Sequence, residues 1–190
     1  SASTMTPAAI EVKPALFMLM SPVTATAVGS LEALPTRIWA EVRSANLVNA
    51  IAAHHFYKTE ALVVDSGTAL TFCYIDRDGV YQGGAIFPGM KICSDSLHEK
   101  TAKIPLIWVE ETNRLYGKST KEAVEIGLYE GFTAVINHMI SKYRAEFPNI
   151  TVIRTGNGLD IFKDKLNIDI YDNQLIFKGL LLLKNSIRND

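Results

Sequence analysis

Three short apolar segments within residues 61–87 constrain the fold of this chain more than any other feature. Residues 61–64 and 69–75 are rich in branched and aromatic side chains, and residues 81–87 add two aromatic residues and an isoleucine. Such segments are typical of buried strands. The second connection ends in Asp78-Gly79, a dipeptide that tolerates positive φ and favours a hairpin. The sequence therefore predicts three consecutive strands joined by tight turns.

Helices and strands alternate in the rest of the chain. Ser119 stands three residues before Glu122, which is a capping box and marks the start of a long helix. Apolar spacing and flanking turn residues define the other elements. Expected helices cover residues 46–57, 90–100, 119–146, 160–166 and 175–185, and two further strands cover 150–153 and 168–171.

This order of elements predicts an α/β fold with a mixed sheet and helices on both faces. It is similar to the ribonuclease-H-like topology of the actin, hexokinase and sugar-kinase superfamily. We expect one complete actin-like domain in residues 61–190 and a partial N-terminal actin-like domain in residues 1–60.

The long helix should bury one stripe of its surface. Gly127 and Gly131 lie one turn apart and permit close packing against a neighbouring element. The predicted inner stripe consists of Ala123, Ile126, Gly127, Phe132, Val135, Ile136 and Met139.

Composition excludes several classes of partner. Of 190 residues 48% are hydrophobic, and 19 basic residues balance 20 acidic ones, so we expect neither nucleic acid nor an anionic membrane as a partner. No apolar run reaches the roughly 18–20 residues that a membrane helix needs. Cys73 and Cys93 could form a disulfide or join a metal site, but free buried thiols in a cytoplasmic protein are the simpler interpretation.

The N-terminal region allows two interpretations. Lys13 precedes the apolar residues 14–20, and small residues 24–27 follow, which resembles a secretory signal. Glu11 and the long polar stretch before Lys13 favour a buried strand instead.

The turn after the first strand carries the chemistry. Asp65 follows two valines and precedes Ser66, Gly67 and Thr68, and Thr71 follows three residues later. Exposed backbone N–H groups, hydroxyls and one carboxylate can hold a phosphate and its counter-cation. The alternative is that Asp65 only caps the turn.

Several segments in a fixed order resemble those of type III pantothenate kinases, and the resemblance covers residues 61–190. The matching segments are 65–71, 83–89, 100–105 and 117–120, with Ala123, Gly127 and Gly131, and the ending 155–156 and 172–180.

The resemblance implies phosphorylation of pantothenate by ATP, the first committed step towards coenzyme A, with Mg²⁺, a monovalent cation (K⁺ or NH₄⁺) and a homodimer. Asp65 would hold the monovalent cation. The residues expected to bind ATP are Gly67, Thr68, Thr71, Thr155 and Gly156, and those expected to bind pantothenate are Gly83, Gly84 and Thr120. For Thr120 the alternative is participation in helix capping.

The chain departs from the family pattern before residue 50. Residues 1–60 lack the family's Asp-x-Gly-Asn-Thr segment, which contacts ATP phosphates and Mg²⁺. Ala45 occupies the expected position of the general base, and Asn46 that of the arginine that binds the substrate carboxylate. A one-residue gap would place Asn46 at the base position, where an amide cannot accept the proton either.

A further departure replaces the family's Gly-Gly-Asp by Gly156-Asn157-Gly158. Asparagine tolerates positive φ, so we expect the turn to be kept while its negative charge is lost.

Two functions therefore compete. The first is a pantothenate kinase with weak or no activity in this form. The second is a non-catalytic dimerising or ligand-binding homologue that kept the fold.

Overall fold

The computed structural model describes residues 45–162 and 164–188, and the side chains of 186–188 are not described. The two interpretations of the N-terminal region concern residues outside this part of the chain. The predicted division at residue 60 stays a prediction for the same reason.

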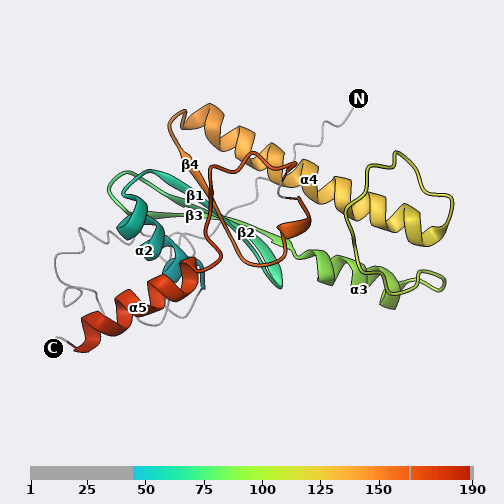
Figure 1. The fold of residues 1–190 in the computed structure, drawn as a ribbon, viewed down its shortest axis with the longest axis horizontal. Helices are drawn as coiled ribbons and strands as arrows, with labels where there is room; N and C mark the ends of the chain where they lie inside the picture. The colour runs from blue at the N-terminus through green and yellow to red at the C-terminus, as the bar shows by residue number, and fades with distance from the viewer. Residues whose placement is uncertain (1–44, 163, 189–190) are drawn as a thin grey trace, which may run out of the picture.

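A five-stranded mixed sheet forms the centre of the molecule (Figure 1), and its strand order is β3-β2-β1-β4-β5. The first three strands are antiparallel, and β4 and β5 run parallel to β1. All five predicted strands are present, although the last is reduced to two residues. Their bounds are Ala61–Ser66 (β1), Ala69–Ile75 (β2), Tyr81–Pro88 (β3), Thr151–Thr155 (β4) and Ile170–Tyr171 (β5).

Helices follow the predicted order as well. The capping box is confirmed, because the Ser119 hydroxyl accepts a hydrogen bond from Glu122 N, and the Glu122 carboxylate accepts one from Lys118 N. The expected helix at 160–166 is only a short 3₁₀ turn. The helices are Ala45–Tyr57 (α2), Met90–Lys100 (α3), Thr120–Glu146 (α4), Asp160–Phe162 (η3) and Leu175–Arg188 (α5).

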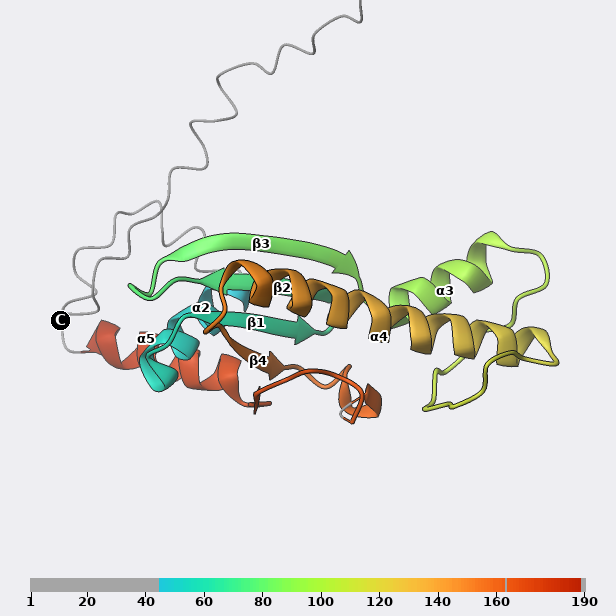
Figure 2. The same cartoon turned by 90° about the horizontal axis from the view of Figure 1, so that it is seen from above.

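The two faces of the sheet are covered by different helices, as Figure 2 shows from above. Leu62, Val64 and Phe72 point to the face that α4 and η3 cover, where Tyr129 and Phe162 stack at 4.9 Å. Val63, Cys73 and Ile153 point to the other face and pack with α2 and with Leu175 of α5. The predicted mixed α/β fold with helices on both faces is therefore confirmed.

The buried stripe of α4 differs in part from the prediction. Phe132 and Ile136 are buried as expected, but Tyr129 and Ile140 complete the stripe. Ala123 and Gly127 are exposed. The stripe is shifted because the N-terminal part of α4 extends beyond the sheet towards α3, where there is no sheet to cover (Figure 1).

Both cysteines are free, Cys73 buried and Cys93 half-buried, so the free-thiol interpretation is confirmed over the disulfide. Within the part of the chain that the structure describes, no helix is long and apolar enough to cross a membrane.

Candidate functional site

Three polar side chains form one row across the sheet. Asp65 of β1 pairs with Thr71 of β2 and with Thr155 of β4. Register partners point to the same face, and these three continue the rows of Val63, Cys73 and Ile153 beneath α2 and α5. The apolar core of this face thus ends in a row of one carboxylate and two hydroxyls, at the carboxyl ends of the parallel strands β1 and β4.

Helix α2 contributes two amides to this row. Asn49 is fully buried, and its Nδ2 donates to Asp65 Oδ2 at 2.8 Å. One turn earlier, Asn46 Oδ1 accepts a hydrogen bond from Thr71 Oγ1 at 3.2 Å. Asn49 Oδ1 is buried and has no hydrogen-bond partner among the described residues, which leaves one acceptor free beside the carboxylate.

Burial raises the pKa of Asp65 above its ordinary value, and the hydrogen bond from Asn49 opposes this rise. No ion pair involves Asp65 within residues 45–162 and 164–188. A partly buried carboxylate with only an amide donor lacks a counter-charge. The donor set, one carboxylate with neutral hydroxyl and amide oxygens, suits a hard cation of low charge.

The turn after β4 lies directly against this row. Gly156 has φ +79°, and a Cβ there would lie 2.7 Å from Asp65 Oδ1 and 2.5 Å from Ser66 O. Only glycine fits this conformation and this approach. The positive φ is therefore supplied by Gly156 and not by Asn157, so the turn is kept for a different reason from the one expected.

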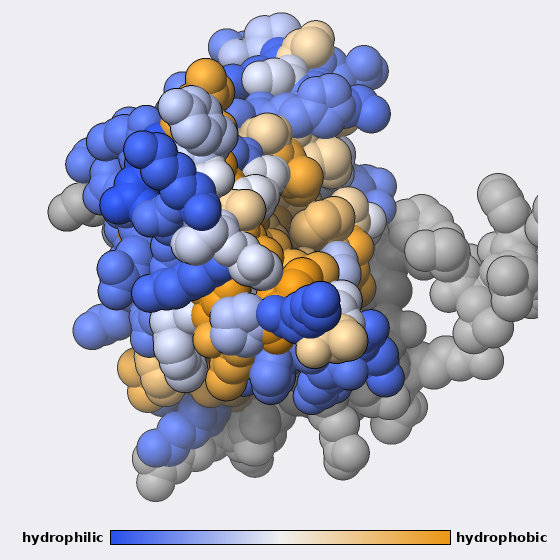
Figure 3. All heavy atoms as spheres, turned by 90° about the vertical axis from the view of Figure 1, so that its right-hand side faces the viewer, coloured by the Kyte–Doolittle hydropathy of each residue, from blue (hydrophilic) through white to orange (hydrophobic). Residues whose placement is uncertain are grey.

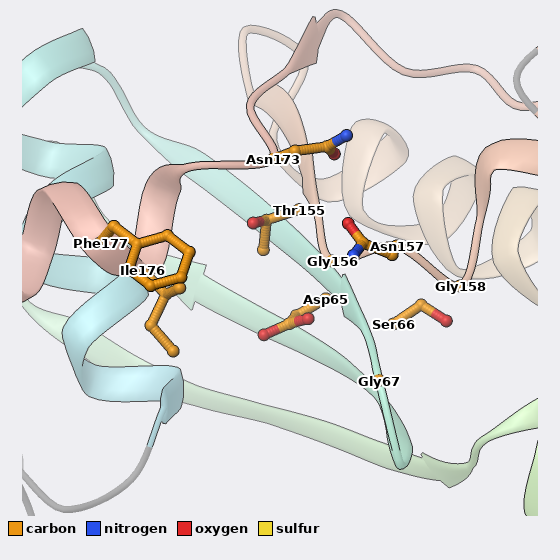
Figure 4. A pocket seen from close by; sticks show the side chains of 10 residues that line it. All are labelled: Asp65, Ser66, Gly67, Thr155, Gly156, Asn157, Gly158, Asn173, Ile176 and Phe177. Atoms are coloured by element: carbon orange, nitrogen blue, oxygen red, sulfur yellow. The ribbon is translucent and has the colours of Figure 1, made fainter.

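A pocket of about 370 Å³ opens above the row. Figure 4 shows Asp65 and Thr155 between the α5 side chains Ile176 and Phe177 and the turn that follows β4. The pocket thus combines a carboxylate, the Thr155 hydroxyl, glycine backbone and one apolar wall. Its lining consists of Asp65, Ser66, Gly67, Thr155, Gly156, Asn157, Gly158, Asn173, Ile176 and Phe177.

Most of the residues predicted to bind ATP or the cation lie together. Asp65, Gly67, Thr155 and Gly156 all line the pocket. Thr71 is next to Asp65 in the sheet, whereas Thr68 is exposed in the same turn and does not line the pocket.

The residues predicted to bind pantothenate lie elsewhere. Gly83 and Gly84 pair with Tyr74 and Cys73, away from the turn at Asp65. A Cβ at Gly84 would lie 1.8 Å from Phe72 O, so the packing of β3 on β2 itself requires this glycine. Thr120 is exposed at the first position of α4, far from the pocket, while Ser119 caps the helix.

Ala45, at the expected position of the general base, is the first residue of α2 and is exposed. Its methyl group carries no proton acceptor. The neighbouring Asn46 hydrogen-bonds to Thr71, so this amide belongs to the polar row but offers no base.

Sequence reasoning missed Asn49 and the α5 wall. Asn49 is a polar residue among the buried alanines of α2, three residues after Asn46, and this spacing places both on one helix face. That pattern could have identified it. Asn173, Ile176 and Phe177 lie within residues 172–180, which resemble the last segment of the family. Only the tertiary structure brings α5 to the end of β1.

Comparisons with known proteins identify the family of this chain. The family model described as type III pantothenate kinase matches residues 40–142. A type III pantothenate kinase of Listeria monocytogenes serotype 4a is 41% identical over 145 residues, which cover 75% of this chain and 56% of the relative. A type III pantothenate kinase of Brevibacillus brevis is 37% identical over 145 residues, covering 75% and 57%. The chain spans about half the length of the curated relatives it matches.

Among solved structures, a Campylobacter jejuni protein assigned to the Baf family of transcriptional activators superposes with a TM-score of 0.52. It is 22% identical, and the match covers 75% of this chain and 65% of that one. This likeness shows the fold alone.

Proposed function

The chain belongs to the type III pantothenate kinase family, and we propose that it binds ATP in the pocket at Asp65 and takes part in the phosphorylation of pantothenate. The observation that carries the proposal is the pocket itself, which gathers Asp65, Gly67, Thr155 and Gly156 from two separate turns. All four are residues that the family motifs assign to the nucleotide or its cation.

The pocket has parts suited to the phosphates of ATP and to its adenine base. Gly67 and Gly156 expose backbone to the pocket, and Thr155 contributes a hydroxyl, which can donate to a phosphate oxygen. Ile176 and Phe177 form an apolar wall of the kind that packs against a nucleobase. Phe177 is 64% exposed, so its ring is free to stack.

The monovalent cation belongs beside Asp65. The carboxylate lacks a cationic partner among the described residues, and Thr71, Thr155 and Asn49 Oδ1 supply neutral oxygens near it. When bound with ATP, Mg²⁺ would neutralise phosphate charge. A single carboxylate lines the described pocket, so the nucleotide phosphates would themselves supply much of the Mg²⁺ coordination.

Pantothenate is proposed to contact Thr120 of one copy and Gly83 and Gly84 of another. Gly83 pairs with Tyr74, which packs on Tyr143 near the C-terminal end of α4, whereas Thr120 begins this helix, so one pantothenate cannot reach both within one copy. The Thr120 hydroxyl is exposed, and Ser119 performs the capping, so capping does not account for Thr120. Thr120 lies at the opposite end of α4 from the sheet and cannot meet ATP bound at Asp65 within one copy (Figure 1).

We also propose a homodimer, as the resemblance implies. Gly127 and Gly131 face open space in this chain, which leaves room for another helix. Figure 3 shows apolar residues gathered at the centre of the molecular end that carries α3 and the start of α4. Ile92 of α3 is exposed, as are Leu106 and Leu115 in the segment that connects α3 to α4. A cytoplasmic location completes the proposal.

A second candidate function rests on Ala45. Without a carboxylate at this position, general-base catalysis is lost, which typically costs about 10²–10⁴ in rate. A non-catalytic homologue would still bind ATP and dimerise. The two candidates differ in turnover and not in binding.

One experiment separates them. ATP-dependent phosphorylation of pantothenate is measured with KCl, with NH₄Cl and with a tetramethylammonium salt, alongside ATP binding by calorimetry. Turnover that requires K⁺ or NH₄⁺ and is lost in Asp65→Ala supports the kinase. ATP binding without turnover, also lost in Asp65→Ala, supports the non-catalytic homologue. ATP binding that survives in Asp65→Ala would contradict the proposed pocket.

A further inference from the structure

A buried arginine lies behind the turn that carries Gly156. Arg154 is 2% exposed and pairs with Val64, so its side chain points to the α4 face, opposite to Asp65. We propose that Arg154 is a positioning residue, whose guanidinium holds residues 155–158 in the shape that lies against Asp65. The inference deepens the proposed function, because it rests on this turn binding the nucleotide.

The guanidinium group makes two bonds to this segment. Nη2 donates to Gly156 O at 3.0 Å and to Asp160 Oδ1 at 2.6 Å. One buried cation therefore ties the start of the turn to the residue that begins η3. The ring of Tyr171 lies 5.6 Å from the guanidinium carbon, within the range of a cation–π contact.

A second contact anchors the far side of the turn. Gly158 N donates to Ser66 O at 3.1 Å, next to Asp65 in β1. With Arg154 holding Gly156 O, the turn is fixed at both ends of a three-residue span. Since a Cβ at Gly156 would come within 2.7 Å of Asp65 Oδ1, a small tilt of the turn changes the space at the carboxylate.

The contacts of Arg154 explain why a charged side chain suits this position. A charged donor makes a stronger hydrogen bond to a backbone carbonyl than a neutral one. Arg154 Nε is buried without a partner among the described residues, so burial of this side chain carries a cost that packing alone does not explain. Asp160 is 59% exposed, and its charge is therefore screened by water more strongly than that of Arg154.

The test compares Arg154→Met with Arg144→Met. The control removes an arginine of similar reach whose partner, Asp169, is near the same sheet edge but outside the pocket. Amide hydrogen exchange at Gly158 is measured relative to β1 amides, which corrects for global stability. We expect Arg154→Met to reduce this relative protection and the ATP affinity about tenfold each. Arg144→Met should leave both within about twofold, and Arg154→Lys should restore part of the loss.

Unchanged relative protection at Gly158 in folded Arg154→Met would overturn the inference, as would unchanged ATP affinity. If Arg154→Met does not fold, Asp160→Ala decides the matter, because this side chain is exposed and its loss should loosen the turn in the same direction. If the parent protein does not bind ATP, the proposed function fails, while the exchange measurement still tests the role of Arg154.

Discussion

At the scale of single residues, Asp65 lowers the stability of the folded chain at the site proposed to bind the cation. Its carboxylate ends an apolar row, and burial raises its pKa, with the Asn49 hydrogen bond as the opposing contribution. A carboxylate with a raised pKa destabilises the folded chain whenever it is ionised. The proposed cation would offset this penalty, whereas an amide of similar shape would fit the site without it.

We expect Asp65→Asn to be more stable than the parent at pH 7. The folded state has the higher Asp65 pKa, so it binds more protons than the unfolded chain between the two values. Stability of the parent therefore falls as pH rises from about 4 through the raised folded pKa, and the penalty persists above it. Asp65→Asn has no carboxylate here and lacks this loss. The difference in Tm between the variant and the parent should therefore grow as the pH rises from about 4 through the folded pKa of Asp65, in a buffer free of K⁺ and NH₄⁺.

Asp78→Asn serves as the control, because Asp78 is exposed in the hairpin and its effect should not follow this pattern. Adding KCl should raise the Tm of the parent and leave Asp65→Asn unchanged. A variant less stable than the parent at pH 7 would show that burial of the charge is not the dominant contribution.

At the scale of elements, the contact between α2 and α5 brings the amides of α2 to the sheet. Asp172, just before α5, is buried and accepts hydrogen bonds from Tyr57 Oη and from Lys178 Nζ, both at 2.7 Å. Burial tends to raise the Asp172 pKa, but these donors and Gln174 N outweigh it and lower the pKa. Burial and then Asp172 raise the pKa of Tyr57 to about 12. The end of α2 is thus fastened to the start of α5.

Tyr57→Phe should lower the free energy of unfolding by about 1–3 kcal/mol, because a buried carboxylate loses one of its donors. Urea denaturation of the parent and the variant measures the difference. Tyr116→Phe, at a residue 71% exposed, is the matched control and should change stability by less than about 0.5 kcal/mol. Equal stability of Tyr57→Phe and the parent would mean that Lys178 alone satisfies Asp172.

At the scale of the whole molecule, the candidate residues lie at three places, the third being Gly83 and Gly84 within β3. The pocket at Asp65 lies at the carboxyl ends of β1 and β4, whereas Thr120 lies at the far end of α4 (Figure 1). Gly127 and Gly131 lie on an exposed face of α4, in the half of the helix that begins at Thr120. The proposed homodimer would cover that face.

Gly127→Leu should therefore convert a dimer into a monomer, because a large side chain fills the space that a second helix needs. Sedimentation velocity gives the mass of both proteins. Glu146→Leu adds the same side chain at the last residue of α4 and should leave the dimer intact. A parent protein that sediments as a monomer would contradict the homodimer directly.

The sequence predicted the order of elements almost completely, because each relies on local patterns. The branched and aromatic residues of 69–75, the Asp78-Gly79 turn and the capping box at Ser119 all act over a few residues. The 3₁₀ turn at Asp160 was predicted too long, and the buried stripe of α4 was shifted in part. Both errors concern contacts with distant elements, which local spacing does not encode.

For the site, the sequence by itself determined which chemical groups are present: the acid at Asp65, the hydroxyls at Thr71 and Thr155, and the absence of a base at Ala45. Only the tertiary structure decided which of these groups meet. Parallel pairing of β1 with β4 places Thr155 beside Asp65, and α2 packing brings Asn49 to the same carboxylate across 16 residues. Chemistry is carried by each residue alone, but proximity is set by the packing of the whole sheet, so the turn at Asp65 becomes a pocket only in the folded chain.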